Sequence, residues 1–226
     1  SDKSNIAIAM AASNAIMFLL NDEDEYENPY LWDIFDAGVN GQDLLAIEVF
    51  PEGTPEYMNS TERDATYEEV LHFMHGFGVQ LALPAMQDAI ESAMLNAINN
   101  DVYNPLSDLS EDDFDEEYFA MGLECYFGLW AHDPNGDGFC GNQEYAFITR
   151  EAMAIGDSVL FAIINGYFGE AWEYTAVLPQ GFNSNFFMKN QEGLDYTYRS
   201  QYLKNIETSG DQSINFYGND FPNQIR

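Results

Sequence analysis

Residues 133–144 carry oxygen-bearing side chains at the alternate positions that a calcium ion requires. Their sequence, DPNGDGFCGNQE, fits the pattern D-x-[DN]-x-[DN]-G-x5-E. Calcium takes roughly six to eight oxygen ligands, and Gly138 stands where the chain must turn sharply around the ion. We expect the ligands to be Asp133, Asn135, Asp137, the Phe139 carbonyl and Glu144, the last through both carboxylate oxygens.

This loop resembles an EF-hand loop, and helical sequence is expected on both of its sides. Its eighth position holds Cys140 where an aliphatic residue is usual, and the chain has no second loop of this pattern. A single loop favours a structural calcium clip over a calcium switch. The alternative is an ordinary surface turn rich in Asp, Asn and Gly.

A second set of candidate metal ligands lies on one stripe of a predicted helix. Glu68, His72 and His75 are spaced i, i+4 and i+7, so they share a helix face, and Glu69 lies beside them. The chain has three histidines, and two of them are in this segment. An imidazole and a carboxylate one helical turn apart can chelate one metal ion.

This segment, Glu68-Glu69-Val70-Leu71-His72, resembles the H-E-x-x-H helix of zincin metallopeptidases. Further along, Glu117-Tyr118-Phe119-Ala120 heads an apolar helix and is similar to the third-ligand helix of gluzincins, particularly the lethal-factor-like branch. The resemblance implies that Glu68, His72 and Glu117 converge on Zn²⁺, with Glu69 as the general base of a zinc-dependent endopeptidase. The chain departs from the family at Glu68, which stands where the family has its first histidine. A second carboxylate lowers the Lewis acidity of the metal and the selectivity of the site for zinc.

A simpler interpretation of the same residues stays open. Acidic residues at a helix start complement the helix dipole, which would account for Glu68, Glu69 and Glu117. His72 and His75 stand among apolar residues and could be hydrogen-bonded core side chains.

The composition excludes some partners. The chain has 39 Asp and Glu against 7 Lys and Arg, a formal net charge of −32. Such a surface repels nucleic acid and anionic membranes but suits divalent cations and a salty medium, so we expect an extracellular or cell-surface location. No segment is long and apolar enough to span a membrane. Cys125 and Cys140 are predicted to form a disulfide, with two buried thiols as the alternative.

The predicted fold is α+β, with a mainly helical, zincin-like body, a short N-terminal sheet and a β-rich tail. We place the body at residues 1–170 and the tail at 171–226, where helix-forming residues give way to Asn, Gly, Tyr and Phe. Helices are predicted at 5–20, from about Asp64 or Thr66 to around Gly76 and Gly78 with a Thr66–Glu69 capping box, from 84 to 100, and at 117–130, 145–154 and 158–168. Strands are predicted at 44–50, 196–207 and 213–217.

The tail sequence from Tyr202 to Ile225 resembles the lead-in to RTX-type repeats, which bind calcium in a parallel β-roll. A plain β-hairpin is the alternative. The chain begins without Met, and we expect it to be part of a longer protein.

Together these patterns predict a secreted, calcium-binding metallopeptidase-like domain of a larger RTX-type protein, with catalysis weakened or lost at Glu68. Its partners would be divalent cations and a peptide or extracellular matrix. The alternative is a non-catalytic, calcium-stabilised structural or adhesive module of a cell-surface protein.

Overall fold

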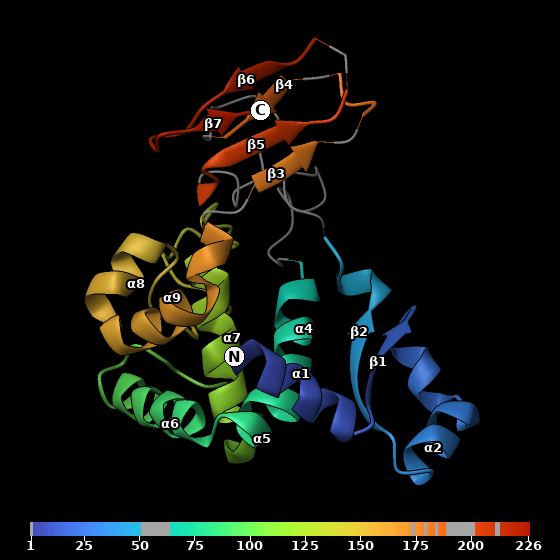
Figure 1. The fold of residues 1–226 in the computed structure, drawn as a ribbon. Coiled ribbons are helices and arrows are strands. Elements are labelled where there is room, and N and C mark those ends of the chain that lie inside the picture. The colour runs from blue at the N-terminus through green and yellow to red at the C-terminus, as the bar shows by residue number, and fades with distance from the viewer. Residues whose placement is uncertain are drawn as a thin grey trace.

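The computed structural model places short strands at either end of a helical body, so the fold is α+β and mainly helical, as predicted (Figure 1). It describes residues 2–50, 64–172, 175–178, 180–183, 185–188, 202–210 and 213–226. Within these residues, no helix combines the length and apolar character that a membrane span needs.

The N-terminal segment is a helix followed by a strand, and the single helix predicted over residues 5–20 is wrong beyond Ala12. Helix α1 covers Asp2–Ala12 and strand β1 covers Ala15–Leu20. Asn14 separates them with a φ of 54°, a left-handed conformation that ends the helix. The apolar run that follows pairs as a strand instead.

Strand β1 pairs in parallel with β2, which covers Asn40–Leu45. The strand predicted at 44–50 therefore begins four residues too late, and residues 46–48 form a 3-10 helix. The polar residues at the start of β2 belong to the strand because their backbones pair with β1. Backbone pairing, and not apolar content, therefore determines where β2 begins. A 3-10 helix at Glu23–Glu27 and helix α2 at Pro29–Asp36 connect the two strands.

Helix α4 covers Thr66–Met74 and does not stop at the glycines that follow it. The chain continues as a π-helix, His75–Val79, and then as α5, Gln80–Ala82. Gly78 is needed there because a Cβ atom would lie 2.7 Å from Ile6 Cγ2 of α1. The predicted capping box is absent, because Thr66 N donates to Asp64 Oδ1 and the Glu69 side chain binds elsewhere.

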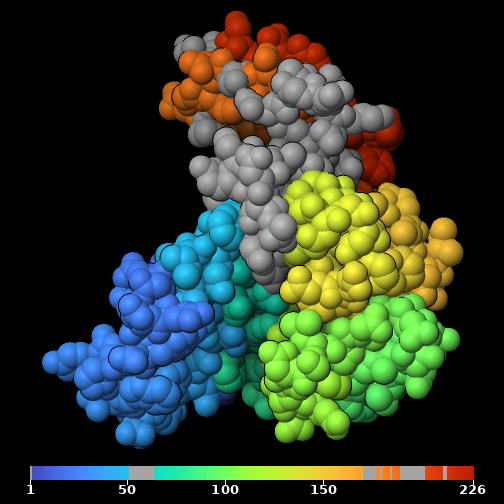
Figure 2. Space-filling view, turned by 180° about the vertical axis from the view of Figure 1, so that it is seen from behind, coloured from blue at the N-terminus to red at the C-terminus, as the bar shows by residue number. Residues whose placement is uncertain are grey.

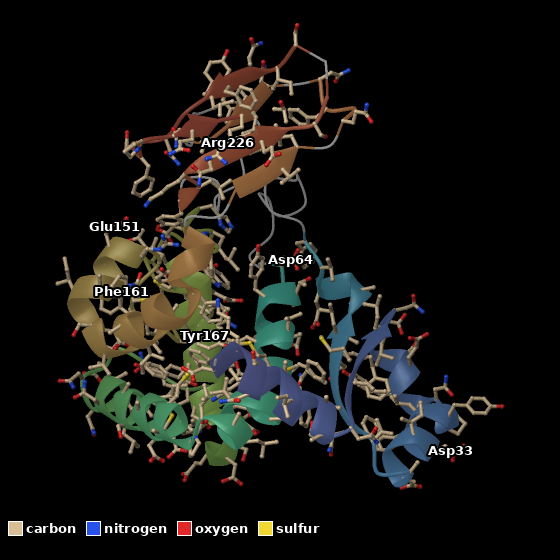
Figure 3. The ribbon with its side chains drawn as sticks, viewed as in Figure 1. Asp33, Asp64, Glu151, Phe161, Tyr167 and Arg226 are labelled. Atoms are coloured by element: carbon tan, nitrogen blue, oxygen red, sulfur yellow. The ribbon has the colours of Figure 1, made fainter. Side chains whose placement is uncertain are left out.

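Helix α7, Phe114–Phe127, lies at the centre of the body. Helix α6, Pro84–Asn99, forms where the sequence predicted a helix and packs against α7. Helices α8, Arg150–Gly156, and α9, Ser158–Trp172, cover another side of α7. Asp157 caps α9, since its Oδ1 accepts from Leu160 N. Tyr167 of α9 lies beside the start of α1, which closes the body (Figure 3).

The tail is built of short parallel strands in two sheets. The strands are β3, Thr175–Leu178; β4, Asn185–Phe187; β5, Asn205–Thr208; β6, Asn215–Tyr217; and β7, Gln224–Ile225. One sheet has the order β3-β5-β7 and the other pairs β4 with β6, so successive strands alternate between sheets. A hairpin would be antiparallel, so that alternative is wrong. The strand predicted at 196–207 overlaps β5, which extends one residue further, and the strand predicted at 213–217 contains β6. Residues 196–201 lie outside the described residues.

Equivalent side chains stack along the tail. The Asn215 amide donates to Asn185 Oδ1 at 2.9 Å, and the Phe187 and Tyr217 rings stack at 4.5 Å. Arg226 extends β7 beside β5, donating to the Ile206 carbonyl (Figure 3). The chain therefore winds through the tail as a coil whose turns stack on one another.

We predict that Gly122→Val destabilises the protein by about 1–3 kcal/mol through overpacking. A Cβ on Gly122 would lie 2.3 Å from Leu160 Cδ2 and 3.1 Å from Ile164 Cδ1, and both of these side chains are fully buried. Gly166 is an exposed position of α9, where an added Cβ meets no atom within 4 Å, so Gly166→Val should change stability by less than about 0.5 kcal/mol. Urea unfolding of both variants measures the difference, and equal effects would show that the α7–α9 contact is not tight.

Candidate metal centre

The structure brings together the three side chains that the zincin resemblance predicts. Glu68 and His72 lie one turn apart on α4, and Glu117 lies in the first turn of α7, which packs against α4. Each residue offers one ligand atom, and these atoms lie within 4.8 Å of one another. Within the described part of the chain, this is the one group of three His, Cys, Asp or Glu residues with that property.

The spacing fits a single bound ion. His72 Nε2 and Glu117 Oε1 are 3.7 Å apart. Two atoms that each lie about 2 Å from a tetrahedral zinc ion are roughly 3.4 Å apart, so the pair needs only a small adjustment. Three protein ligands leave a fourth position for water, as in catalytic zinc sites. Two carboxylates with one imidazole also suit Mn²⁺ or Fe²⁺.

Glu69 lies beside this group on α4. Its Oε2 accepts a hydrogen bond of 2.6 Å from Gln42 Nε2 of β2 and lies 3.9 Å from His72 Nδ1. The pKa of the Glu69 carboxyl is raised to about 7, first by burial and then by three neighbouring carboxylates, while the Gln42 hydrogen bond acts in the opposite direction. The neighbours are Asp43, Glu48 and Glu117. A carboxyl group with a pKa near neutrality is suited to general acid–base work.

The surface is hollowed along α4. Figure 2 shows this hollow between the blue-to-cyan N-terminal residues and the green-to-yellow helices, with teal residues at its floor. Glu69 and Glu117 keep 17% and 22% of their side-chain surface exposed, so both carboxylates are within reach of solvent. The arrangement could hold a metal ion with water access and place a basic carboxylate next to it.

His75, the third residue of the predicted stripe, is not part of the group. It is fully buried in the π-helix, where its Nε2 lies 2.7 Å from Gln87 Oε1 and 3.9 Å from Asp115 Oδ2. Burial lowers the pKa of the His75 imidazole, which favours the neutral ring. The core-histidine interpretation therefore applies to His75.

The loop at residues 133–144 turns as an ion-binding loop should at its start. Asp133 Oδ1 accepts from the backbone N–H groups of Asp137 and Gly138, each at 3.1 Å. Gly138 has a φ of +78°, the left-handed conformation for which the glycine was predicted. The first half of the loop is thus folded around the Asp133 carboxylate.

The second half of the loop differs from a helix-loop-helix. Cys140 forms a short antiparallel bridge with Tyr145, and α8 begins only at Arg150 instead of near residue 145. The Glu144 carbonyl accepts from Asn104 N at 2.7 Å, and Glu144 Oε2 accepts from Asn142 N at 3.2 Å. Within the described residues, the carboxylates of the loop do not form a group with ligand atoms within 4.8 Å of one another. Calcium binding there stays a prediction.

The predicted disulfide between Cys125 and Cys140 is absent, and both residues are buried thiols. The Cys125 thiol donates to the Thr149 carbonyl at 3.4 Å, whereas the Cys140 thiol donates to the Phe147 carbonyl at 3.0 Å. Each sulfur is thus directed to a different backbone carbonyl, and the alternative of two buried thiols holds.

Comparison with known proteins gives no match to a protein-family model, a curated protein or a solved structure. The case for a metal centre therefore depends on the geometry of the site. Sequence reasoning missed Gln42, whose position opposite Glu69 could be found only from the packing of β2 against α4.

We predict that the chain, first saturated with Ca²⁺, binds one further Zn²⁺ or Co²⁺ ion at Glu68, His72 and Glu117. Glu117→Gln should weaken this binding at least about tenfold, because it replaces a charged ligand with a neutral amide. The matched control is Glu116→Gln, since Glu116 accepts from Gln80 and is not in the group. Titration calorimetry measures the affinities, and equal affinity in the two variants would contradict the assignment.

We also predict that Ca²⁺ binds at residues 133–144 and stabilises the fold. Binding to the folded state alone adds about 2.7 kcal/mol when free Ca²⁺ is 100 times its dissociation constant, which raises the melting temperature by about 5–10 °C. EDTA should remove this gain, and Ca²⁺ should restore it better than Mg²⁺. Glu144→Gln should blunt the response, whereas Asn142→Ala should not. A melting curve that ignores chelator and calcium would show the prediction to be wrong.

Proposed function

We propose that the chain is a secreted, calcium-binding metallopeptidase-like domain of a larger RTX-type protein. The observation that carries the proposal is the convergence of Glu68, His72 and Glu117 from two helices, with Glu69 beside them. Core packing alone does not require two carboxylates and an imidazole at one point, since each would be easier to solvate separately.

The residues divide the work of peptide hydrolysis between them. A Zn²⁺ ion held by Glu68, His72 and Glu117 would supply Lewis acidity that lowers the pKa of a water molecule. Glu69 would take a proton from a water molecule as the oxygen of that water attacks the peptide carbonyl carbon. Glu69 then gives the proton to the leaving nitrogen as the C–N bond breaks.

The tail supports the RTX part of the proposal. Its strands pair in parallel and alternate between two sheets, which is the arrangement of a β-roll. The net charge of −32 also suits folding in a calcium-rich, salty medium outside the cell, because cations screen the repulsion between carboxylates.

One observation favours a second candidate, a non-catalytic, calcium-stabilised structural or adhesive module that contacts a peptide or extracellular matrix. The first ligand position is Glu68, and two carboxylates donate more negative charge to the metal than one would. The metal then polarises water less strongly, so a metal bound here could have a purely structural role.

Metal analysis and catalysis separate the two candidates. Purified protein should contain close to one equivalent of zinc or a similar transition metal besides calcium if the site binds metal in either role. Calcium alone would overturn the metallopeptidase-like candidate, and cleavage of peptide decides between the two candidates when the metal is present.

We predict that the wild-type chain, supplied with Zn²⁺, Mn²⁺ or Co²⁺, cleaves members of a peptide library and that Glu69→Gln abolishes this cleavage. Gln keeps the shape of the side chain but cannot take the proton, so metal content should be unchanged. Glu116→Gln serves as the control that retains cleavage. A wild-type chain that cleaves no peptide with any of these metals would leave the structural module as the better account.

A further inference from the structure

We propose that Gln42 is a positioning residue that holds Glu69 in place as the general base, an inference that rests on the proposed function. Gln42 Nε2 donates to Glu69 Oε2 at 2.6 Å, and this bond joins strand β2 to helix α4 across 27 positions of sequence.

Both ends of this hydrogen bond are on regular elements. Gln42 is the third residue of β2 and lies opposite Met17 in the parallel ladder with β1. Glu69 is in the first turn of α4, and α4 packs against β2. Backbone hydrogen bonds fix both Cα positions. The Gln42–Glu69 hydrogen bond therefore fixes the direction of the Glu69 carboxylate relative to both elements.

The bond also selects one carboxylate oxygen. Oε2 is the oxygen that accepts from Gln42 and lies 3.9 Å from His72 Nδ1. An oxygen engaged by an amide N–H is a poorer proton acceptor, so Oε1 becomes the oxygen that takes the proton from water. Gln42 thereby determines which oxygen is the better proton acceptor as well as where the carboxylate lies.

The surroundings explain why Glu69 needs such a contact. Asp43, Glu48 and Glu117 are close enough for their negative charges to act on Glu69. These charges favour a rotamer that carries the Glu69 carboxylate away from them, towards solvent. Gln42 opposes that movement with a neutral donor, and it adds no positive charge that would compete with a metal ion.

Asp43, the next residue of β2, has a hydrogen-bond partner of its own. The Tyr26 hydroxyl donates to Asp43 Oδ2. Successive residues of a strand point to opposite faces, so Gln42 and Asp43 are committed to different partners. Gln42 therefore donates to Glu69, while the Asp43 carboxylate accepts from Tyr26.

The test compares Gln42→Leu with the matched control Gln80→Leu in the full chain loaded with Ca²⁺ and Zn²⁺. Gln80 Nε2 donates to Glu116 Oε1 at 3.0 Å, so the control removes the same kind of bond from a carboxylate outside the metal group. We expect Gln42→Leu to lower kcat by about 10- to 100-fold, with KM and zinc content unchanged, because a misdirected base affects the chemical step and not binding. Gln80→Leu should keep kcat within about twofold.

A second variant and a second readout guard against misfolding. Gln42→Glu places a like charge against Glu69 and should lower kcat at least as far. Affinity for a peptidyl hydroxamate, measured on the Co²⁺-loaded chain by its d–d absorption, should fall in both Gln42 variants, because the base must accept the hydroxamate proton. Unchanged melting temperatures would show that the variants fold.

The outcomes distinguish failure of the proposed function from failure of the role of Gln42. No cleavage by the wild-type chain with any metal would overturn the proposed function and this inference with it. Cleavage by the wild type, loss in Glu69→Gln, and a Gln42→Leu kcat within twofold of wild type would overturn the role of Gln42 alone. A change confined to KM or zinc content would also overturn it.

Discussion

The burial of α7 on all sides is the constraint on which the rest of the structure depends. Tyr118, Phe119 and Tyr126 of this helix are completely buried, and α4, α6, α8 and α9 all pack against it. Its rotation is fixed by a close approach to α9 at Gly122 and by the Tyr118 hydroxyl, which donates to buried Asp157 at 2.6 Å. Because Tyr118 follows Glu117 directly, the same contacts aim Glu117 at α4.

The loop at residues 133–144 and the tail are also tied to α7. Tyr145, the residue after Glu144, donates to the same oxygen of Asp157 as Tyr118 does. Arg150 lies between the rings of Tyr126 and Tyr202, 3.9 and 3.8 Å from their centroids, and so joins the body to the tail. A desolvated guanidinium between two aromatic rings contributes about 2 kcal/mol or more per contact. One central helix therefore sets the positions of the metal group, the loop and the first residues of the strands.

The parts that the sequence predicted are those that short-range rules determine. The i, i+4 spacing of Glu68 and His72 defines a shared helix face without any knowledge of the fold, and a Pro followed by periodic apolar residues defines α6. Glu117 came from resemblance to a family motif, because nothing local relates it to His72. The parallel strands of the tail likewise agree with a motif that implies a coil.

The parts that were missed depend on partners distant in sequence. The extent of β2 depends on its pairing with β1. The two glycines after α4 do not end the helical run, because Gly78 is where α1 packs too closely for a side chain. The predicted disulfide required two sulfurs to face each other, and a separation of 15 residues says nothing about direction. The Thr66–Glu69 capping box is absent because α4 begins one residue earlier, with Ala65 at its N-cap, and the Glu69 side chain accepts from Gln42 instead.

Neutral side chains, and not cations, hydrogen-bond many of the buried carboxylates of this chain. This leaves negative charge in the interior that favours binding of a cation. The carboxylates of the chain outnumber its Lys and Arg residues, 39 to 7, and many of those packed in the interior bind neutral donors. Examples are Gln42 with Glu69, Gln80 with Glu116, Gln87 with Asp115, Trp130 with Glu124, and Tyr118 with Asp157. A neutral donor removes the cost of an unmade hydrogen bond but leaves the negative charge in place. The interior therefore keeps a negative potential around α4 and α7, where a divalent ion could lower the electrostatic free energy that the protein's own side chains leave unbalanced.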